Sequence, residues 1–206
     1  INRYPDNKHT ELKKVVSDIK KVNVNQVIFG NGTDEIFDLI VRVFCNPYKD
    51  KIITLPPTYG MYDVIAKTNG VENIEIPLKS DFSIDKNQIL KLHSTSIKVL
   101  FLCSPNNPTG NSFDTNNLTD LIKAFKGIVV IDEAYIDFSS KQSLISLIED
   151  NNNLIITQTM SKAYGMAGIR LGMGFSSKKI IDYLNKIKPP YNINVLTEKK
   201  ALEELN

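Results

Sequence analysis

Apolar residues recur three and four positions apart in several segments of the chain. Residues 9–22 show this spacing first, and it predicts a helix with one apolar face. Residues 33–45 repeat the spacing, and Thr33 is a plausible N-cap for the second helix. The same pattern predicts further helices over residues 60–69, 85–93, 114–126 and 177–188. The chain also ends on a helical pattern.

Short runs of β-branched and other apolar residues lie between the helical segments. These runs predict strands over residues 51–56, 73–78, 97–103, 127–133, 153–160 and 169–175. Residues 127–133 and 153–160 are almost continuously apolar, which indicates strands that are buried on both faces. Strands of this kind that alternate with helices predict an α/β protein, with a mainly parallel sheet between two helical layers.

Polar side chains lie where three of the predicted strands end. Asn107 follows the strand at residues 97–103, Asp132 ends the next one, and Lys162 follows the strand at residues 153–160. Ligands of open α/β sheets bind outside the carboxyl ends of the strands. We therefore expect these three side chains to lie at one site.

The composition is that of an ordinary globular protein. Of the 206 residues, 42% are apolar and 23% are charged, and the formal net charge is +2. A charge this close to neutral gives no reason to expect nucleic acid or an anionic membrane as a partner. No apolar run approaches the ~20 residues that span a membrane. No signal-peptide pattern is present, so we expect a cytoplasmic protein.

The cysteines and histidines give no sign of a disulfide framework or a metal site. Cys45 and Cys103 both follow apolar runs, so we expect two buried free thiols in a reducing compartment. His9 and His93 lie far apart in the sequence, without the spacing of metal ligands.

Lys162 lies among small and apolar residues, eight positions before Arg170. Only three of the 25 basic residues are arginine, so an arginine at this point is informative. One interpretation is a lysine whose stem is buried and whose amine reaches solvent. The other is a Schiff-base lysine, because desolvation and nearby cations lower the pKa of an amine and free it as a nucleophile. Taken alone, this stretch leaves both interpretations open.

Asp132 and Asn107 also have two interpretations each. Asp132 is either a turn or cap residue, or a carboxylate that keeps a ring nitrogen protonated. Tyr135 follows it by three residues. Asn107 lies in "SPNNPTG", which is either a simple tight connection or a rigid turn that aims an amide at a ligand oxygen.

The run "FGNGTDE" places two glycines before a predicted helix, where backbone N–H groups can hold a phosphate. Asp34 and Glu35 add negative charge at the same place, so an anion there would need cations from elsewhere. Arg170 and Lys162 are the candidates, and Ser161 offers a hydroxyl.

Tyr59 and Tyr62, in "PPTYGMY", are either aromatic core or rings that stack on a planar ligand. No single motif decides between structural and functional interpretations. Together they fit one ligand, a planar and phosphorylated heterocycle that carries an aldehyde, which is pyridoxal 5'-phosphate.

The motifs resemble those of the fold-type I pyridoxal-phosphate aminotransferases over essentially the whole chain. They occur in the family's order, as "NRYPD", "GNGTDE", "PPTYGMY", "SPNNPTG", "VVIDEAYIDF" and "SKAYGMAGIRLG". The runs "DEAYIDF" and "PPTYGMY" favour the branch of the family that acts on histidinol phosphate. The resemblance therefore implies the large cofactor domain of such an enzyme.

The resemblance also implies a role for each matched residue. Lys162 would form the Schiff base with the cofactor and then carry the proton, and Asp132 would pair with the pyridine nitrogen. Tyr135 and Asn107 would hydrogen-bond the cofactor's phenolic oxygen, and Tyr59 would stack on its ring. The phosphate would be held by Gly32, Thr33, Asp34, Ser161 and Arg170. Tyr4 resembles the tyrosine that reaches the partner subunit's cofactor, which implies a homodimer.

The reaction implied is amino transfer from L-histidinol phosphate to 2-oxoglutarate in histidine biosynthesis, which gives imidazole acetol phosphate and L-glutamate. An aromatic aminotransferase and a threonine-phosphate decarboxylase share the cofactor residues and remain alternatives. A truncated remnant without catalytic activity is a third alternative.

The resemblance divides the chain into three parts. Residues 1–30 would form an N-terminal connecting segment and the first helix, residues 31–190 the cofactor domain, and residues 191–206 the start of a linker helix. Members of the family run well beyond 206 residues, and their smaller domain carries the arginines that hold the substrate. That domain is largely absent here, so we expect this chain alone to catalyse poorly or not at all.

Overall fold

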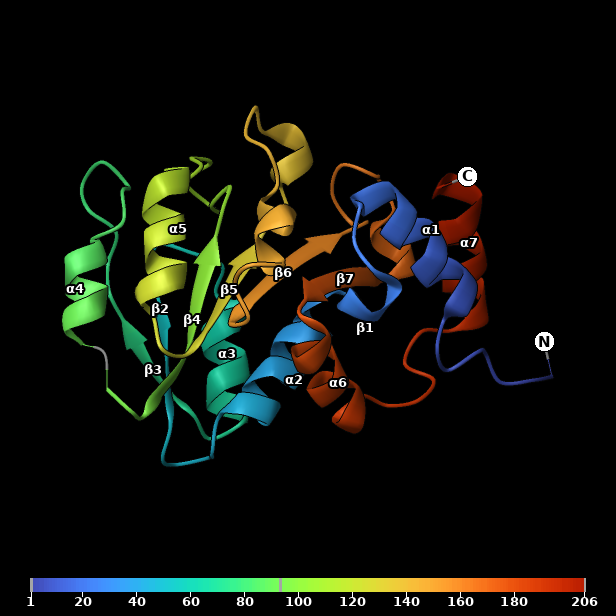
Figure 1. The fold of residues 1–206 in the computed structure, drawn as a ribbon, viewed down its shortest axis with the longest axis horizontal. Helices are drawn as coiled ribbons and strands as arrows, with labels where there is room; N and C mark the ends of the chain where they lie inside the picture. Colours follow the sequence, from blue (N-terminus) through green and yellow to red (C-terminus); the bar gives the residue numbers. More distant parts are fainter. Residues whose placement is uncertain (1, 93, 206) are drawn as a thin grey trace.

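A seven-stranded sheet forms the centre of the computed structural model, which describes residues 2–92 and 94–205 (Figure 1). The strand order is β1-β7-β6-β5-β4-β2-β3. In chain order the strands are β1 (Val27–Asn31), β2 (Lys51–Thr54), β3 (Glu72–Glu75), β4 (Ile97–Cys103), β5 (Ile128–Asp132), β6 (Leu154–Thr159) and β7 (Leu171–Ser176). Within the described residues β7 alone runs against the others, pairing antiparallel with both β1 and β6. The predicted mainly parallel sheet is confirmed.

Helices cover both faces of this sheet, which confirms the predicted three layers (Figure 1). One layer contains α2 (Thr33–Phe44), α3 (Met61–Thr68) and α6 (Lys178–Ile187). The other contains α1 (Thr10–Lys20), α4 (Lys86–Lys91), α5 (Thr115–Ala124) and α7 (Val195–Leu205). Among the described residues, none of these helices is both long and apolar enough to cross a membrane.

The apolar stripes of the helices account for this arrangement. Ile36 and Ile40 of α2 are fully buried against one face of the sheet, and Leu118 and Leu121 of α5 are buried against the other. Every residue of β6 is buried, as its continuous apolar run predicts for a strand covered on both faces. His93 lies outside the described residues.

The sequence patterns did not predict β1. This strand holds three apolar residues before a glycine and an asparagine, a run too short to distinguish from a loop. It nevertheless lies at the edge of the sheet, in antiparallel register with β7 from Val27 to Asn31. The sheet therefore begins before residue 31, where the predicted cofactor domain starts.

Glycines allow the loop before α2 to pack directly on β7. A Cβ at position 172 would lie 2.5 Å from the Thr33 nitrogen, and closer still to the Gly32 carbonyl carbon. Gly32 itself has φ 76°, in the left-handed region that favours glycine. The close approach fixes the N-terminus of α2 at the edge of the sheet where the parallel strands end.

We expect Gly172→Ala to destabilise the chain by about 1–3 kcal/mol, because the added methyl overlaps backbone that cannot yield without moving α2. Gly60→Ala is the matched control, since a Cβ at position 60 meets no atom within 4 Å and φ there is −67°. Urea unfolding followed by circular dichroism measures both variants. Equal unfolding midpoints would contradict the packing argument.

Candidate active site

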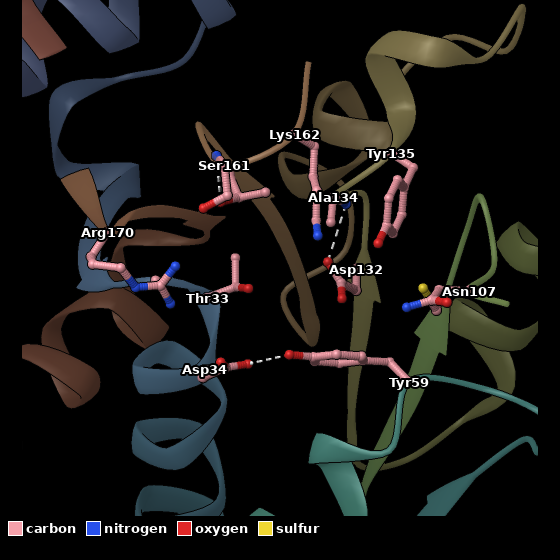
Figure 2. Close-up of a pocket in the computed structure, with 13 residues that line it drawn as sticks. Thr33, Asp34, Tyr59, Asn107, Asp132, Ala134, Tyr135, Ser161, Lys162 and Arg170 are labelled. Carbon is pink, nitrogen blue, oxygen red and sulfur yellow. Dashed lines mark hydrogen bonds between the residues drawn. The ribbon is translucent and has the colours of Figure 1, made fainter. Parts of the chain in front are cut away.

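The segments that follow β1, β2, β4, β5 and β6 enclose one pocket, with an empty volume of about 560 Å³ (Figure 2). Its lining residues are Gly32, Thr33, Asp34, Tyr59, Cys103, Asn107, Asp132, Ala134, Tyr135, Thr159, Ser161, Lys162 and Arg170. Ten of the eleven residues predicted to hold the cofactor are among them, and the exception is Tyr4. The three predicted strand-end side chains, Asn107, Asp132 and Lys162, do lie at one site.

Asp132 ends β5 as a buried carboxylate with three hydrogen-bond donors. The Tyr62 hydroxyl donates to Oδ2 at 2.7 Å. The backbone N–H of Ala134 donates to Oδ1 at 3.1 Å, and the Thr157 hydroxyl donates to the same oxygen at 3.2 Å. Donors on α3, β6 and the segment after β5 therefore hold the carboxylate at the floor of the pocket.

Burial raises the pKa of Asp132 to about 6 from an ordinary value of 3.8. The donors from Tyr62, Ala134 and Thr157 lower this pKa, because they bind the ionised form, while the charge of Asp34 raises it further. The outcome is a carboxyl group that is mostly ionised at neutral pH and is sensitive to any charge that enters the pocket.

The neighbouring acid, Glu133, points away from the pocket. Its carboxylate accepts hydrogen bonds from the Ser143 hydroxyl at 2.6 Å, the Leu144 N–H at 2.7 Å and the Gln158 amide at 2.9 Å. Because successive side chains of a strand alternate between faces, only one acid of this pair can serve the site. Glu133 instead ties the segment after β5 to β6.

Lys162 enters the pocket from the segment after β6, with its amine turned toward Asp132 (Figure 2). Its Nζ lies 5.2 Å from the centroid of the Tyr135 ring, within reach of a cation–π interaction. The side chain is exposed in this chain, as in the interpretation of an amine that reaches solvent, and the Schiff-base role stays a prediction. The lysine ends up exposed because "SKAYG" leaves the sheet as a turn beyond the buried strand.

Backbone and side-chain donors gather where α2 begins. Gly32 is the N-cap of α2 and offers no side chain to occupy the first N–H groups of the helix. Arg170 lies against it, since a Cβ at position 32 would come within 2.6 Å of the arginine Nη2. Arg170 has φ 56°, and its carbonyl accepts the Gly32 N–H at 2.7 Å. With Ser161 in the same lining, these groups form a setting that suits an anion.

The two acids after Gly32 face different ways. Glu35 accepts hydrogen bonds from the Asn31 N–H at 2.6 Å and the Asn192 amide at 2.7 Å. Its carboxylate is therefore paired with donors that do not line the pocket. Asp34 lines the pocket and accepts the Tyr59 hydroxyl at 3.2 Å. Burial, with the nearby Asp34 charge, raises the pKa of Tyr59 to about 12. Only one of the two predicted negative charges therefore bears on an anion in the pocket.

The two asparagines of "SPNNPTG" also have separate tasks. Asn106 is buried, and its amide donates to the Pro57 carbonyl at 2.9 Å and to the Thr109 hydroxyl at 2.7 Å. Asn107 lines the pocket, and no hydrogen bond holds its amide among the described residues. Asn106 thus fixes the turn, and Asn107 presents a free amide to the pocket (Figure 2).

The sequence patterns missed three lining residues, Cys103, Ala134 and Thr159. Cys103 and Thr159 end β4 and β6, so their strand-end positions were the available signal. Cys103 is a buried free thiol as predicted, and burial raises its pKa to about 12. Cys103 is therefore an uncharged residue of the pocket lining at neutral pH and not a nucleophile.

Tyr4 lies away from this pocket. Its side chain is 80% exposed and stacks on Tyr191 with ring centroids 4.5 Å apart. Its expected role at a partner subunit's cofactor stays a prediction.

Comparisons with known proteins agree on one family. Residues 1–205 match the model of the family "Aminotransferase class I and II". The chain is 55% identical over 205 residues to a histidinol-phosphate aminotransferase of Flavobacterium psychrophilum and 53% identical to that of Flavobacterium johnsoniae. Each comparison covers 100% of this chain but 59% of the relative, so the chain spans about three fifths of these relatives' length.

Solved structures give the same result for the fold. The histidinol-phosphate aminotransferase of Clostridium acetobutylicum superposes with a TM-score of 0.89 at 28% identity, covering 100% of this chain and 61% of that one. The histidinol-phosphate aminotransferase of Sinorhizobium meliloti, solved in complex with pyridoxal-5'-phosphate, gives 0.91 at 23% identity, over 98% of this chain and 56% of that one. With the match of the family model over nearly every residue, the chain belongs to the class I and II aminotransferases.

Proposed function

We propose that the pocket binds pyridoxal 5'-phosphate, and that the chain is the cofactor-binding part of an enzyme that transfers the amino group of L-histidinol phosphate to 2-oxoglutarate. The products would be imidazole acetol phosphate and L-glutamate, in histidine biosynthesis. The observation that carries the proposal is the convergence of the Lys162 amine, the buried Asp132 carboxylate and the Arg170 guanidinium in one pocket. The names of the relatives at about 50% identity support the substrate.

The lining fits the chemical parts of this cofactor. Lys162 offers an amine to an aldehyde, and Asp132 offers a mostly ionised carboxylate to a ring nitrogen. The uncapped N-terminus of α2, with Arg170 and Ser161, suits a phosphate. The rings of Tyr59 and Tyr135 and the amide of Asn107 suit a flat heterocycle that carries an oxygen.

When bound, the cofactor supplies an electron-accepting ring at the carbon that carries the substrate's amine. The chain's own groups would handle the protons. Lys162, which lines the pocket, would act as the free amine: its Nζ would take the proton from that carbon and return one to a carbon of the cofactor. Asp132, held by its three donors, would keep a proton on the ring nitrogen.

Substrate recognition would lie largely outside this chain. Arg170 lines the cofactor pocket, and Arg42 pairs with Asp38 on α2 at 3.5 Å. Arg3 is exposed near Tyr4, in the segment proposed to meet a partner subunit. No arginine of the described residues is therefore left to hold a substrate phosphate in the pocket. A homodimer, a cytoplasmic location and low activity of this chain alone are parts of the proposal.

The proposed division keeps residues 31–190 as the cofactor domain but adds β1, from Val27, to its sheet. The remaining residues of 1–30, and residues 191–206, would connect this domain to the rest of the enzyme. The first and last helices fit this division, since α1 packs against α7. His9, just before α1, also pairs with Glu198 of α7 at 3.2 Å. The two end segments would thus form one unit at the side of the sheet.

Replacing Lys162 by alanine should abolish covalent attachment of the cofactor and its absorbance band. Lys14→Ala is the matched control, because Lys14 is an exposed lysine on α1, away from the pocket. Borohydride reduction followed by peptide mass spectrometry locates the modified lysine. Modification at a different lysine, or an unchanged band in the Lys162 variant, would rule out the assignment.

Asp132→Asn should stabilise the cofactor-free chain at neutral pH and weaken cofactor binding. A carboxyl group whose folded pKa is about 6, above its usual 3.8, costs stability in its ionised form, about 3 kcal/mol at neutral pH. That cost grows from pH 3.8 to about 6 and is absent below pH 3.8, so the stability gained by the variant should disappear in acid.

Urea unfolding of wild type and Asp132→Asn across this pH range measures the effect. A variant that is less stable at neutral pH, or one whose advantage persists at the acid end, would show that burial does not penalise the Asp132 charge.

The substrate is tested on the full-length enzyme of which this chain is proposed to be the cofactor-binding part. Histidinol phosphate and 2-oxoglutarate should give glutamate, while threonine phosphate and aromatic amino acids should turn over at least tenfold more slowly. Threonine phosphate is included because a threonine-phosphate decarboxylase of Porphyromonas gingivalis shares the fold, with a TM-score of 0.85. Preferential turnover of another substrate would reject histidinol phosphate but not the cofactor.

A further inference from the structure

We propose that Tyr62 is a positioning residue that acts through Asp132, keeping this carboxyl group ionised so that it can hold a proton on the cofactor's ring nitrogen. This inference rests on the proposed function, and it assigns a task to a residue that does not line the pocket.

The contact between the two residues is short and buried. The Tyr62 hydroxyl lies 2.7 Å from Asp132 Oδ2, although the residues are 70 positions apart in the sequence. Tyr62 is fully buried, and Asp132 is 3% exposed. A charge-assisted hydrogen bond of this kind is stronger than a neutral one, and burial strengthens it further.

Aromatic packing fixes the direction of the Tyr62 hydroxyl. The ring stacks on Phe101 with centroids 4.8 Å apart and an interplanar angle of 13°. Phe37 and Tyr59 pack edge-on against it, at 5.2 Å and 5.5 Å. With three neighbouring rings in place, the hydroxyl cannot follow the carboxylate if the carboxylate turns. The tyrosine therefore sets the orientation of Asp132 as well as its charge.

The chemistry of the donor decides which form of Asp132 is favoured. Burial, and the nearby Asp132 charge, raise the pKa of Tyr62 well above its ordinary value, so Tyr62 stays a phenol. A phenol donates its hydrogen bond best to an ionised carboxylate, which lowers the pKa of Asp132 against the effect of burial.

Other groups around the carboxylate act in both directions. Asp34 on α2 raises its pKa, and Thr157 on β6 lowers it through a hydrogen bond of 3.2 Å. Tyr59 and Cys103 stay uncharged near neutral pH because burial raises the pKa of each to about 12. Lys162 shares the pocket and carries a positive charge when protonated. Tyr62 is the donor in the shortest of these hydrogen bonds.

The first test uses the cofactor-free protein, so that its outcome does not depend on catalysis. The carboxyl carbon of Asp132, labelled and identified through its absence in Asp132→Asn, is titrated by NMR. The wild-type midpoint should lie at about 6. In Tyr62→Phe, which keeps the ring and removes the hydroxyl, the midpoint should rise by about one pH unit.

Two variants distinguish this effect from a loss of packing. Thr157→Val removes a longer hydrogen bond to the same carboxylate, so it should raise the midpoint by less than Tyr62→Phe does. Phe37→Leu removes a ring packed on Tyr62 but no donor, so it should lower stability and leave the midpoint in place. An unchanged midpoint in Tyr62→Phe, or an equal rise in Phe37→Leu, would overturn the inference.

The second test uses the holoenzyme. Tyr62→Phe should shift the acid limb of the pH profile for kcat upward by about one unit, a roughly tenfold loss at a pH below the limb. KM for the amino donor should change little, because Tyr62 lies outside the pocket. Tyr62→Phe could raise the titration midpoint of Asp132 in the first test and yet leave the acid limb of the kcat profile in place. That result would show that the charge of Asp132 does not limit the reaction, and it would overturn the inference.

The absorbance band of the bound cofactor distinguishes a failure of the proposed function from a failure of the role of Tyr62. A wild type that forms no Lys162-dependent absorbance band with pyridoxal phosphate refutes the cofactor, whatever the titration of Asp132 shows. The proposed action of Tyr62 on the cofactor's ring nitrogen is then refuted as well. A wild type that forms the band, combined with an unchanged Asp132 midpoint in Tyr62→Phe, refutes the role of Tyr62 alone.

Discussion

The arrangement of the site depends on one buried charge, the carboxylate of Asp132 at the end of β5. Removing a carboxylate from water is costly unless donors surround it, and here the donors come from three separate elements. Tyr62 reaches it from α3, Thr157 from β6, and Ala134 from the turn that follows. Burial disfavours the charge, and the packing of the α3 layer on the sheet supplies the donors that keep the buried carboxyl mostly ionised at neutral pH.

The direction of the strands brings the remaining groups to this carboxylate. Because β4, β5 and β6 are parallel neighbours, Asn107, Asp132 and Lys162 follow them at the same edge of the sheet. Arg170 precedes β7, and the antiparallel run of β7 places its beginning at that same edge. Parallel strands bring to this edge only the residues at their carboxyl ends. The reversed strand β7 also brings Arg170, which precedes its first residue.

Sequence patterns could predict the strand-end residues because a parallel sheet places its carboxyl ends together. They named Asn107 rather than Asn106, but they gave no physical reason for choosing between the two adjacent asparagines. Asn106 and Asn107 have the same side chain, and only packing shows that the first fixes the turn. They also missed β1, which is too short for its apolar spacing to identify it as a strand, and they left open whether Lys162 is buried or exposed. Each difference arises from contacts between segments far apart in the sequence.

The energetic cost of Asp132 explains why Tyr62 is buried beneath it rather than replaced by an apolar residue. A pKa raised by burial means that the ionised carboxyl destabilises the fold at neutral pH, and each donor that favours the charged form offsets part of this cost. A phenylalanine at position 62 would pack the same rings but would leave the charge with weaker support. A site selected for stability alone would not contain this carboxylate. Its presence, together with a hydroxyl held 2.7 Å away, is what the proposed pairing with a cofactor's ring nitrogen requires.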